Sequence, residues 1–409
     1  MASVVATGTQ AKRQAKRSLW WRVHQWAGLQ LSLLLAFILA TGTIATLSHE
    51  IDWLLTPAMR VAPQEGAPAS WGALAASARA AAGDARIERI SAPLDPWFAA
   101  ETIAQRPDGQ RFRIQLHPWT AKVQGYSTWF NAQRLFRELH RHLMLPPKWG
   151  IPIVTALSVP MLASVITALF VYKKWWRGFF RLPRRRKDRR NDGRRFTGDL
   201  HRFAGLWSLW FVALIGVTGL WYLTEWGGGQ APVPRPPITL PQAQADGPTL
   251  DQAVSLAQRH YPELRITSIY FPEGKPGGLI VMGNAEALLV RERANAVMID
   301  PNSQAVVEVV RGEELSLHQR ISEAADPLHF GSWGGLPTRI LWFLCGAALT
   351  GLAVTGVLIH ALRLRQEAAA RASTGILSAM WRAMGFMAWP SLLLLILAFS
   401  IIPTKFTGE

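Results

Sequence analysis

The sequence predicts a mainly α-helical membrane protein with four core transmembrane helices, two small α+β outer domains and a fifth helix at its end. Three observations favour this fold. Five long windows are apolar and nearly free of charge, and about 20 such residues cross a hydrocarbon core about 30 Å thick. Basic residues gather in short segments on one side of these windows. The order of helix, outer domain and helix occurs twice, and the pattern of residues 24–42 recurs at 201–219.

The apolar windows divide the chain into membrane and aqueous segments. The first window is far longer than the core of a signal peptide and has no evident small-residue cleavage site, so we expect it to remain as an anchor. The predicted transmembrane helices are 26–48, 150–172, 203–224, 340–362 and 384–402. The predicted aqueous segments are 1–25, 49–149, 173–202, 225–339, 363–383 and 403–409.

The formal net charge of +17 lies mostly beside the predicted helices. Twelve lysines and arginines fall between Lys173 and Arg195, and further clusters precede the first helix and follow the fourth. Basic residues in short loops mark the cytoplasmic side, and all these clusters share one side if the N-terminus is cytoplasmic. The charge therefore predicts topology in a bacterial inner membrane rather than nucleic-acid binding. Segments 49–149 and 225–339 then face the periplasm.

The two periplasmic segments share a local pattern of one helix followed by a strand, a turn pinned by proline and a returning strand. We expect each segment to form a small domain. The single cysteine, Cys345, lies in the fourth helix, so neither segment can hold a disulfide. In chain order the helix and the two strands are 71–82, 111–118 and 120–123, and then 250–260, 296–301 and 303–306.

Four of the ten histidines stand in matched positions at helix ends. His24 and His201 open the first and third helices at the inner face, and His140 and His329 precede the second and fourth at the outer face. Histidine is costly inside a bilayer and usually has a partner there. Two imidazoles at one depth, from facing helices, can bind the two sides of one haem. We therefore predict an inner haem on His24 and His201 and an outer haem on His140 and His329.

Glycines follow the first and third histidines at fixed spacing. Gly28 and Gly205 lie four residues on, one turn along the same helix face. Gly42 and Gly219 lie eighteen residues on, which is five turns of a straight helix. We expect all four to leave room for the flat porphyrins along one face of helices one and three. Glycines at these spacings also suit close helix packing without a cofactor.

Other residues compete for these roles or support them. His49, His142 and His360 lie near the same depths and are alternative ligands. Arg141 and Arg202 stand beside predicted ligands and are candidates to pair with haem propionates or to anchor the interface. The chain has no Cys-x-x-Cys-His, so the haems are predicted to be b-type. It also has neither the His-Glu-x-x-His of zinc proteases nor a Gly-x-Gly-x-x-Gly after a strand.

Six stretches carry a family resemblance: His24–Leu29, Leu139–Arg141, His201–Leu206, Thr218–Gly219, Leu328–Gly331 and Gly334–Pro337. Through them the chain resembles the PepSY-associated transmembrane-helix family of bacterial inner-membrane proteins and, within it, the di-haem siderophore reductases. The resemblance implies two b haems on the four histidines, a cytoplasmic or quinol electron donor, and a ferric siderophore or ferric chelate as the periplasmic acceptor. His142 and His360 depart from the family pattern, so the ligand assignment stays open.

Two other classes of function remain open. The chain would be a non-catalytic sensor, assembly factor or protease-regulating protein if its PepSY-like domains bind a partner and the histidines are structural. It would be a transporter subunit if its parallel repeats form a permease. The first three helices carry no carboxylate or lysine at mid-membrane, which disfavours the transporter because proton and ion pathways usually need such groups.

Overall fold

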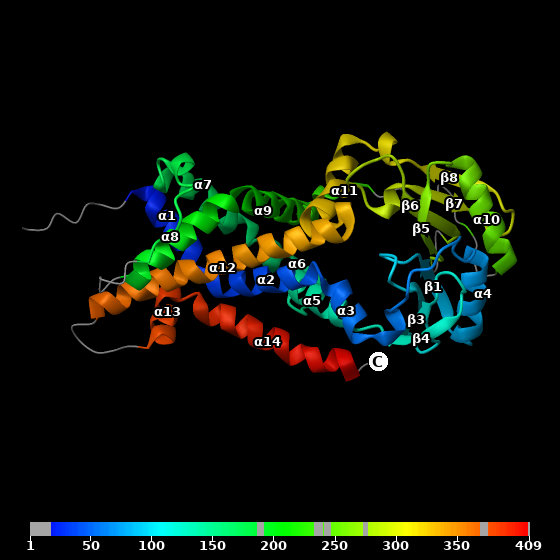
Figure 1. Ribbon diagram of the computed structural model, residues 1–409, viewed down its shortest axis with the longest axis horizontal. Helices are drawn as coiled ribbons and strands as arrows, with labels where there is room; N and C mark the ends of the chain where they lie inside the picture. Colours follow the sequence, from blue (N-terminus) through cyan, green and yellow to red (C-terminus); the bar gives the residue numbers. More distant parts are fainter. Residues whose placement is uncertain are drawn as a thin grey trace, which may run out of the picture.

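A helical bundle forms one end of the molecule and a β-sheet forms the other (Figure 1). The computed structural model describes residues 18–185, 192–232, 240, 247–272, 277–368 and 375–407. The basic N-terminal residues 1–17 and residues 186–191 of the basic linker lie outside these ranges. Four helices are long and apolar enough to cross a membrane, and one bent helix pair supplies a fifth span. The chain is therefore a multi-pass membrane protein.

Each predicted transmembrane window corresponds to helical structure, with shifted ends. The second span begins at Pro147, a position that suits proline because the first helical N–H needs no partner. The spans are α1 and α2 (Leu19–Gln30 and Ser32–Ala45), α6 and α7 (Pro147–Thr155 and Ser158–Val171), α9 (Leu209–Thr224), α12 (Gly335–Ala368) and α14 (Ala388–Thr407).

The first span is not the single straight helix expected over 26–48. α1 and α2 meet at 65°. At the break the hydroxyl of Ser32 donates to the carbonyl of Leu29 at 2.7 Å, and hydroxyl groups that bond the helix backbone in this way bend helices. The span also begins at Leu19, so His24 lies inside α1 rather than at its mouth. Positions 24 and 42 consequently do not share one helix axis.

The two outer segments build one antiparallel sheet of eight strands in the order β4-β3-β2-β1-β5-β6-β7-β8. The expected strand–turn–strand units correspond to β3–β4 and β7–β8, although the returning strands begin at Val123 and Val306, where the expected ones end. The strands are β1 (Arg86–Ser91), β2 (Ala100–Gln105), β3 (Arg111–Leu116), β4 (Val123–Thr128), β5 (Arg265–Tyr270), β6 (Leu279–Asn284), β7 (Ala296–Ile299) and β8 (Val306–Val310).

The outer segments are joined, where the sequence led us to expect two small domains. β1 and β5 pair across the middle of the sheet, with Ile90 opposite Ile269. α4 (Trp71–Ala82) and α10 (Gly247–His260) pack against each other, and residues from both helices and both half-sheets form one hydrophobic core. The pairing removes two exposed strand edges, which would otherwise leave backbone N–H and C=O groups without partners.

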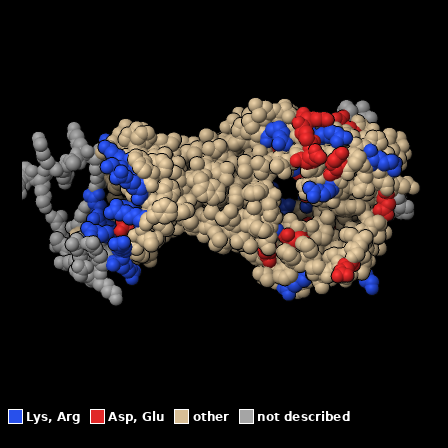
Figure 2. Space-filling view, turned by 45° about the horizontal axis from the view of Figure 1, so that its top comes forward, with Lys and Arg blue, Asp and Glu red and all other residues tan. Residues whose placement is uncertain are grey.

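Shorter helices connect the spans to the sheet. α3 (Ser48–Leu55), α5 (Ala132–His142) and α11 (Leu317–Phe330) lie where the bundle meets the sheet, which we call the sheet end (Figure 1). α8 (Asp192–Trp207) and α13 (Ile376–Met384) lie at the opposite end. Lysines and arginines gather at that opposite end, which we call the basic end (Figure 2).

Asp251 on α10 links the two halves of the outer core, and its loss should destabilise that core. Its carboxylate accepts a hydrogen bond from the N–H of Gly72 at 2.7 Å and one from the hydroxyl of Ser70 at 2.8 Å, at the start of α4. Asp251→Ala removes both bonds and should cost about 1 kcal/mol. Thermal unfolding of the purified protein should show a lower midpoint, whereas Asp84→Ala, at an exposed site, should not. Equal midpoints would show that the halves do not depend on this contact.

Candidate functional site

Two helices at the sheet end bring His140 and His329 together, and we call these residues the outer pair. Their ring centres lie 6.0 Å apart and their planes are inclined by 41°. α5 is fixed at its first turn by Asp52, whose carboxylate accepts two backbone N–H groups at 2.8 and 3.0 Å. α11 begins with a capping box at Ser316. Both helices thus have defined starts, and their last turns carry the histidines.

Hydrogen bonds fix the orientation of both imidazoles. Nδ1 of His140 lies 2.8 Å from the carbonyl oxygen of Ile38 on α2, and a carbonyl only accepts, so this nitrogen donates. Nδ1 of His329 lies 2.8 Å from Oγ1 of Thr218 on α9. The Thr218 hydroxyl already donates to the carbonyl of Leu214 at 2.8 Å, so it accepts from His329. We infer that both rings carry their proton on Nδ1 and keep a lone pair on Nε2.

The histidines at the basic end follow the same arrangement. Nδ1 of His24 lies 3.1 Å from the carbonyl oxygen of Ser164 and 3.2 Å from the hydroxyl of Thr167, both on α7. Nδ1 of His201 lies 2.9 Å from Oγ1 of Thr355 on α12, and this hydroxyl donates to a carbonyl one turn back at 2.7 Å. Among the described residues, no hydrogen bond uses Nε2 of any of these four histidines.

A cavity surrounds the outer pair. It contains about 430 Å³ of space that protein atoms do not fill, part of it open to the surroundings. Apart from the imidazoles, its walls are largely apolar and include Phe211 of α9 and Trp342 of α12. Gly42 of α2 and Gly346 of α12 also line it, so backbone borders the space directly.

The outer pair fits a metal held between two imidazoles. A metal–nitrogen bond to histidine is about 2 Å long and the ring centre lies about 1 Å behind the nitrogen, so two such rings have centres about 6 Å apart. The observed 6.0 Å agrees with this spacing. A haem supplies the other nitrogen ligands itself, so two protein ligands suffice. Metal-binding histidines usually donate their second N–H to a protein acceptor, as all four do here. The residues present therefore fit haem.

Removal from bulk water keeps the outer pair neutral. It lowers the pKa of His140, against the opposing effect of the hydrogen bond to Ile38. It lowers the pKa of His329 to about 3. Because an ordinary histidine titrates near pH 6.5, both rings are neutral at pH 7. Neutral imidazole is the form that binds a metal ion.

The four glycines singled out from the sequence have different surroundings. A Cβ on Gly42 would lie 2.5 Å from Cε1 of His140, so glycine is what lets this ring pack against α2. A Cβ on Gly28 would meet nothing within 4 Å and one on Gly205 nothing nearer than 3.7 Å, so both leave space at the basic end. A Cβ on Gly219 would lie 3.1 Å from a serine of α7. Gly219 therefore serves helix packing and, contrary to our expectation, does not line the outer cavity.

The alternative ligands lie outside the outer pair. His49 on α3 is exposed on the side that faces the sheet. His142 is buried against Gly150 at the start of the second span. His360 lies at the basic end, where its Nδ1 is 3.3 Å from Nε2 of Gln25. His360 is thus a neighbour of the inner histidines.

The two arginines proposed for haem propionates differ in their pairing. Nη2 of Arg202 lies 2.6 Å from the carboxylate of Asp199, and its guanidinium lies 5.4 Å from the ring centre of Tyr172. Its charge is therefore already compensated. Arg141 is exposed beside His140. Arg137, which the sequence did not single out, lies one turn before His140 on α5 and interacts with the charge of Arg141.

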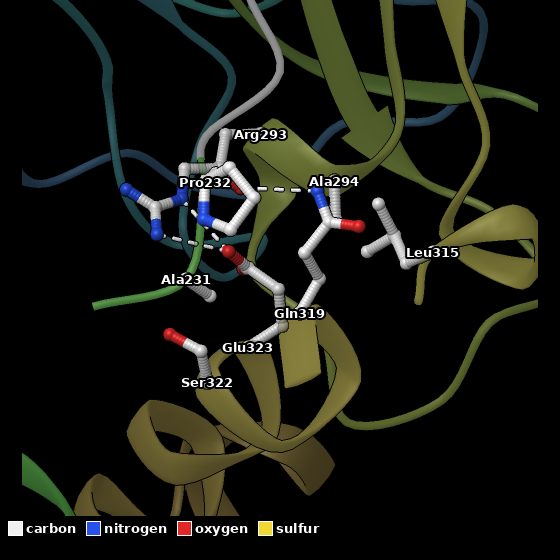
Figure 3. Close-up of a pocket in the computed structure, with 8 residues that line it drawn as sticks. All are labelled: Ala231, Pro232, Arg293, Ala294, Leu315, Gln319, Ser322 and Glu323. Carbon is white, nitrogen blue, oxygen red and sulfur yellow. Dashed lines mark hydrogen bonds and ion pairs between the residues drawn. The ribbon is translucent and has the colours of Figure 1, made fainter. Parts of the chain in front are cut away.

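Ion pairs hold α11, and with it His329, against the outer sheet. Glu323 on α11 accepts hydrogen bonds from Arg291 at 2.8 Å and from Arg293 at 3.0 Å. Figure 3 shows the Arg293–Glu323 pair at the wall of a small pocket beside α11. The hydroxyl of Tyr222 on α9 donates a hydrogen bond to Asp326 of α11 at 2.7 Å. The ring centre of Tyr222 lies 5.3 Å from that of His329. The ionic network thus reaches the outer pair.

Reading the sequence alone missed the threonines that hold the imidazoles. Thr218 belongs to the repeated Thr-Gly motif, so its recurrence was an available signal. Its counterpart Thr41 bonds the carbonyl of Ile38 at 3.1 Å, the same oxygen that accepts from His140. Thr355 stands in no motif, and only the packing of α8 against α12 shows its role.

Comparison with known proteins agrees with this architecture. The chain matches the family described as the PepSY-associated TM region over residues 21–363, a range that contains all four histidines and the whole outer sheet. No curated protein matches the chain. The family match covers well over half of the 409 residues. The chain therefore belongs to the PepSY-associated TM region family.

Proposed function

We propose that the chain is a di-haem electron carrier that moves electrons from the basic end of the bundle to a ferric siderophore or other ferric chelate at the sheet end. The observation that carries the proposal is the shared arrangement of four histidines. Each bonds the bundle through Nδ1, and in the described part of the chain none uses Nε2 for a hydrogen bond. They form two sets, one toward each end, as an electron path across a membrane requires.

The charge distribution supports a direction for this path. Lysines and arginines gather at the basic end (Figure 2), and such clusters stay in the cytoplasm during membrane insertion. The proposed donor is then a cytoplasmic reductant or a membrane quinol. The sheet end faces the periplasm of a bacterial inner membrane, where a ferric chelate arrives.

The residues of the bundle would set the properties of each site. A bound b-type haem supplies one-electron redox chemistry. His140 and His329 are held in one orientation, and the acceptors on their Nδ1 atoms raise the basicity of Nε2. The apolar wall with Phe211 and Trp342 limits the access of water. No acid, base or nucleophile is needed, because Fe²⁺ has a lower charge than Fe³⁺ and a hard oxygen-donor chelate binds it less tightly.

Absorption spectra of the detergent-purified protein, oxidised and then reduced with dithionite, test the proposal directly. We expect the Soret and α bands of b-type haem and about two haems per chain. His24→Ala and His329→Ala should each remove about one haem, because each deletes an axial ligand at one end. A colourless preparation from haem-replete cells would rule the proposal out. Variants that keep both haems would refute the pairing.

Thr218→Val and Thr355→Val test the hydrogen bonds to Nδ1. Each replacement preserves side-chain shape but deletes the acceptor for one histidine, so haem affinity at that end should fall about tenfold to a hundredfold. The rate of haem loss to excess apo-myoglobin measures this. Thr350→Val is the matched control, because the Thr350 hydroxyl bonds the carbonyl of Gly346. Equal rates for all three variants would contradict the assigned role of the two threonines.

Gly42→Ala should remove the outer haem and spare the inner one. The new Cβ would lie 2.5 Å from the His140 ring, which would have to leave its position against α2. Gly351→Ala is the control, since its Cβ would meet nothing within 4 Å. Haem content from the reduced spectrum should fall by about half in the first variant only. If both variants keep both haems, the contact between Gly42 and His140 does not position the ligand.

A further inference from the structure

A hollow separates the sheet from the sheet end of the bundle, and Lys or Arg side chains are visible inside it (Figure 2). One wall is the face of the sheet that α4 and α10 leave uncovered. Ile90, Ala100 and Ile114 point toward those helices and belong to the shared core. Side chains alternate along strands, so the neighbours of these residues face the bundle. On β1, β2 and β3 those neighbours include Arg89, Ser91, Glu101, Arg113 and Gln115.

The second half-sheet presents a different surface on the same side. Its middle strands are apolar there, and Ala296, Met298 and Val310 form a small core of their own, while Ser268 of β5 and Glu308 of β8 also face this side. Ile280, Met282 and Leu315 pack against that core. The arginines that β1 and β3 turn toward the bundle therefore have no counterparts on β6 and β7.

Charged groups from two sides converge at His49 on α3. Glu101, Arg113 and Arg89 act on it from the sheet, and Arg339 acts on it from α12. His49 is nevertheless exposed, as expected for a side chain that lines an open hollow. Thr46, one turn earlier, lines the cavity of the outer pair. His49 and the wall of that cavity thus lie about one helical turn apart along the chain.

Two arginines of this wall have donors without acceptors. Nε of Arg89 and Nε of Arg113 form no hydrogen bond within the described residues. Arg113 is only 6% exposed, and its Nε lies 3.6 Å from the carboxylate of Glu101, too far for a hydrogen bond. Arg89 forms no ion pair in the described ranges. Arg339, in contrast, pairs with both Glu50 and Asp95.

We propose that the hollow is the acceptor site and that it binds an anionic ferric chelate whose carboxylate oxygens accept hydrogen bonds from the half-buried guanidinium of Arg89, with the buried Arg113 adding positive charge behind it. This inference rests on the proposed electron-carrier function and narrows its acceptor. Guanidinium groups match carboxylates in geometry and charge. A chelate in the hollow would lie on the sheet side of the outer pair, which is the direction of the proposed electron path.

Gallium(III) citrate tests this site without electron transfer, because it resembles the ferric complex but is redox-inert. Calorimetric titration of the full-length protein in detergent should show binding that weakens as salt concentration rises. Arg89→Gln should weaken it by about tenfold or more. Arg259→Gln is the matched control, because it removes the same charge from an exposed position on α10 behind the sheet. A cationic gallium(III) trihydroxamate should bind much more weakly than the citrate complex.

Equal affinities of Arg89→Gln and Arg259→Gln, or equal binding of the cationic chelate, would overturn the anionic site. Unchanged haem content in Arg89→Gln shows that the variant is folded. The failures of the two proposals can be told apart. A two-haem protein that does not bind gallium citrate overturns the acceptor site alone, whereas a colourless protein that binds it overturns the electron carrier alone.

Discussion

The hydrogen bond at Nδ1 of each histidine is the interaction on which the rest of the site depends. An N–H group without an acceptor is costly inside an apolar bundle. The helices supply acceptors without giving up their own structure. Ile38 offers a carbonyl, and Thr218 and Thr355 offer hydroxyls whose own protons already go to helix carbonyls. Each imidazole is therefore held in one tautomer, and the spacing of the outer pair follows from where these acceptors stand.

The outer sheet contributes to the same geometry from a distance. α5 and α11 each carry one histidine of the outer pair in their last turn. α5 follows β4 after a connection of three residues, and Glu323 of α11 accepts hydrogen bonds from Arg291 and Arg293, which lie between β6 and β7. Because β1 and β5 pair, both helices are attached to one continuous sheet rather than to two independent domains. Two domains free to move would not keep two rings 6.0 Å apart.

The sequence was sufficient for features that depend on local periodicity. It predicted the five spans, the helix over residues 71–82 and the two returning strands, because apolar length and alternation encode them. It did not predict the bend after Gln30, because Gly28 and Ser32 on its two sides also occur in straight membrane helices and the bond of the Ser32 hydroxyl forms only in three dimensions. It also could not separate the roles of Gly42 and Gly219, because helix packing and ring packing require glycine at the same spacing.

The two halves of the chain are alike in order of elements and different in the surface they turn toward the bundle. A duplicated unit explains two sets of histidines, but one outer pair needs only one acceptor site. The face of the second half carries Met298 and its apolar neighbours, whereas the face of the first half carries Arg89 and Arg113, whose Nε atoms have no acceptor among the described residues. Arginines with donors that lack acceptors are costly to remove from water. Packing of this sheet face alone does not offset that cost. A ligand rich in oxygen atoms would supply the missing acceptors. The difference between the two half-sheets is then explained by a single acceptor site on the sheet side of the outer pair, at the end of the proposed electron path.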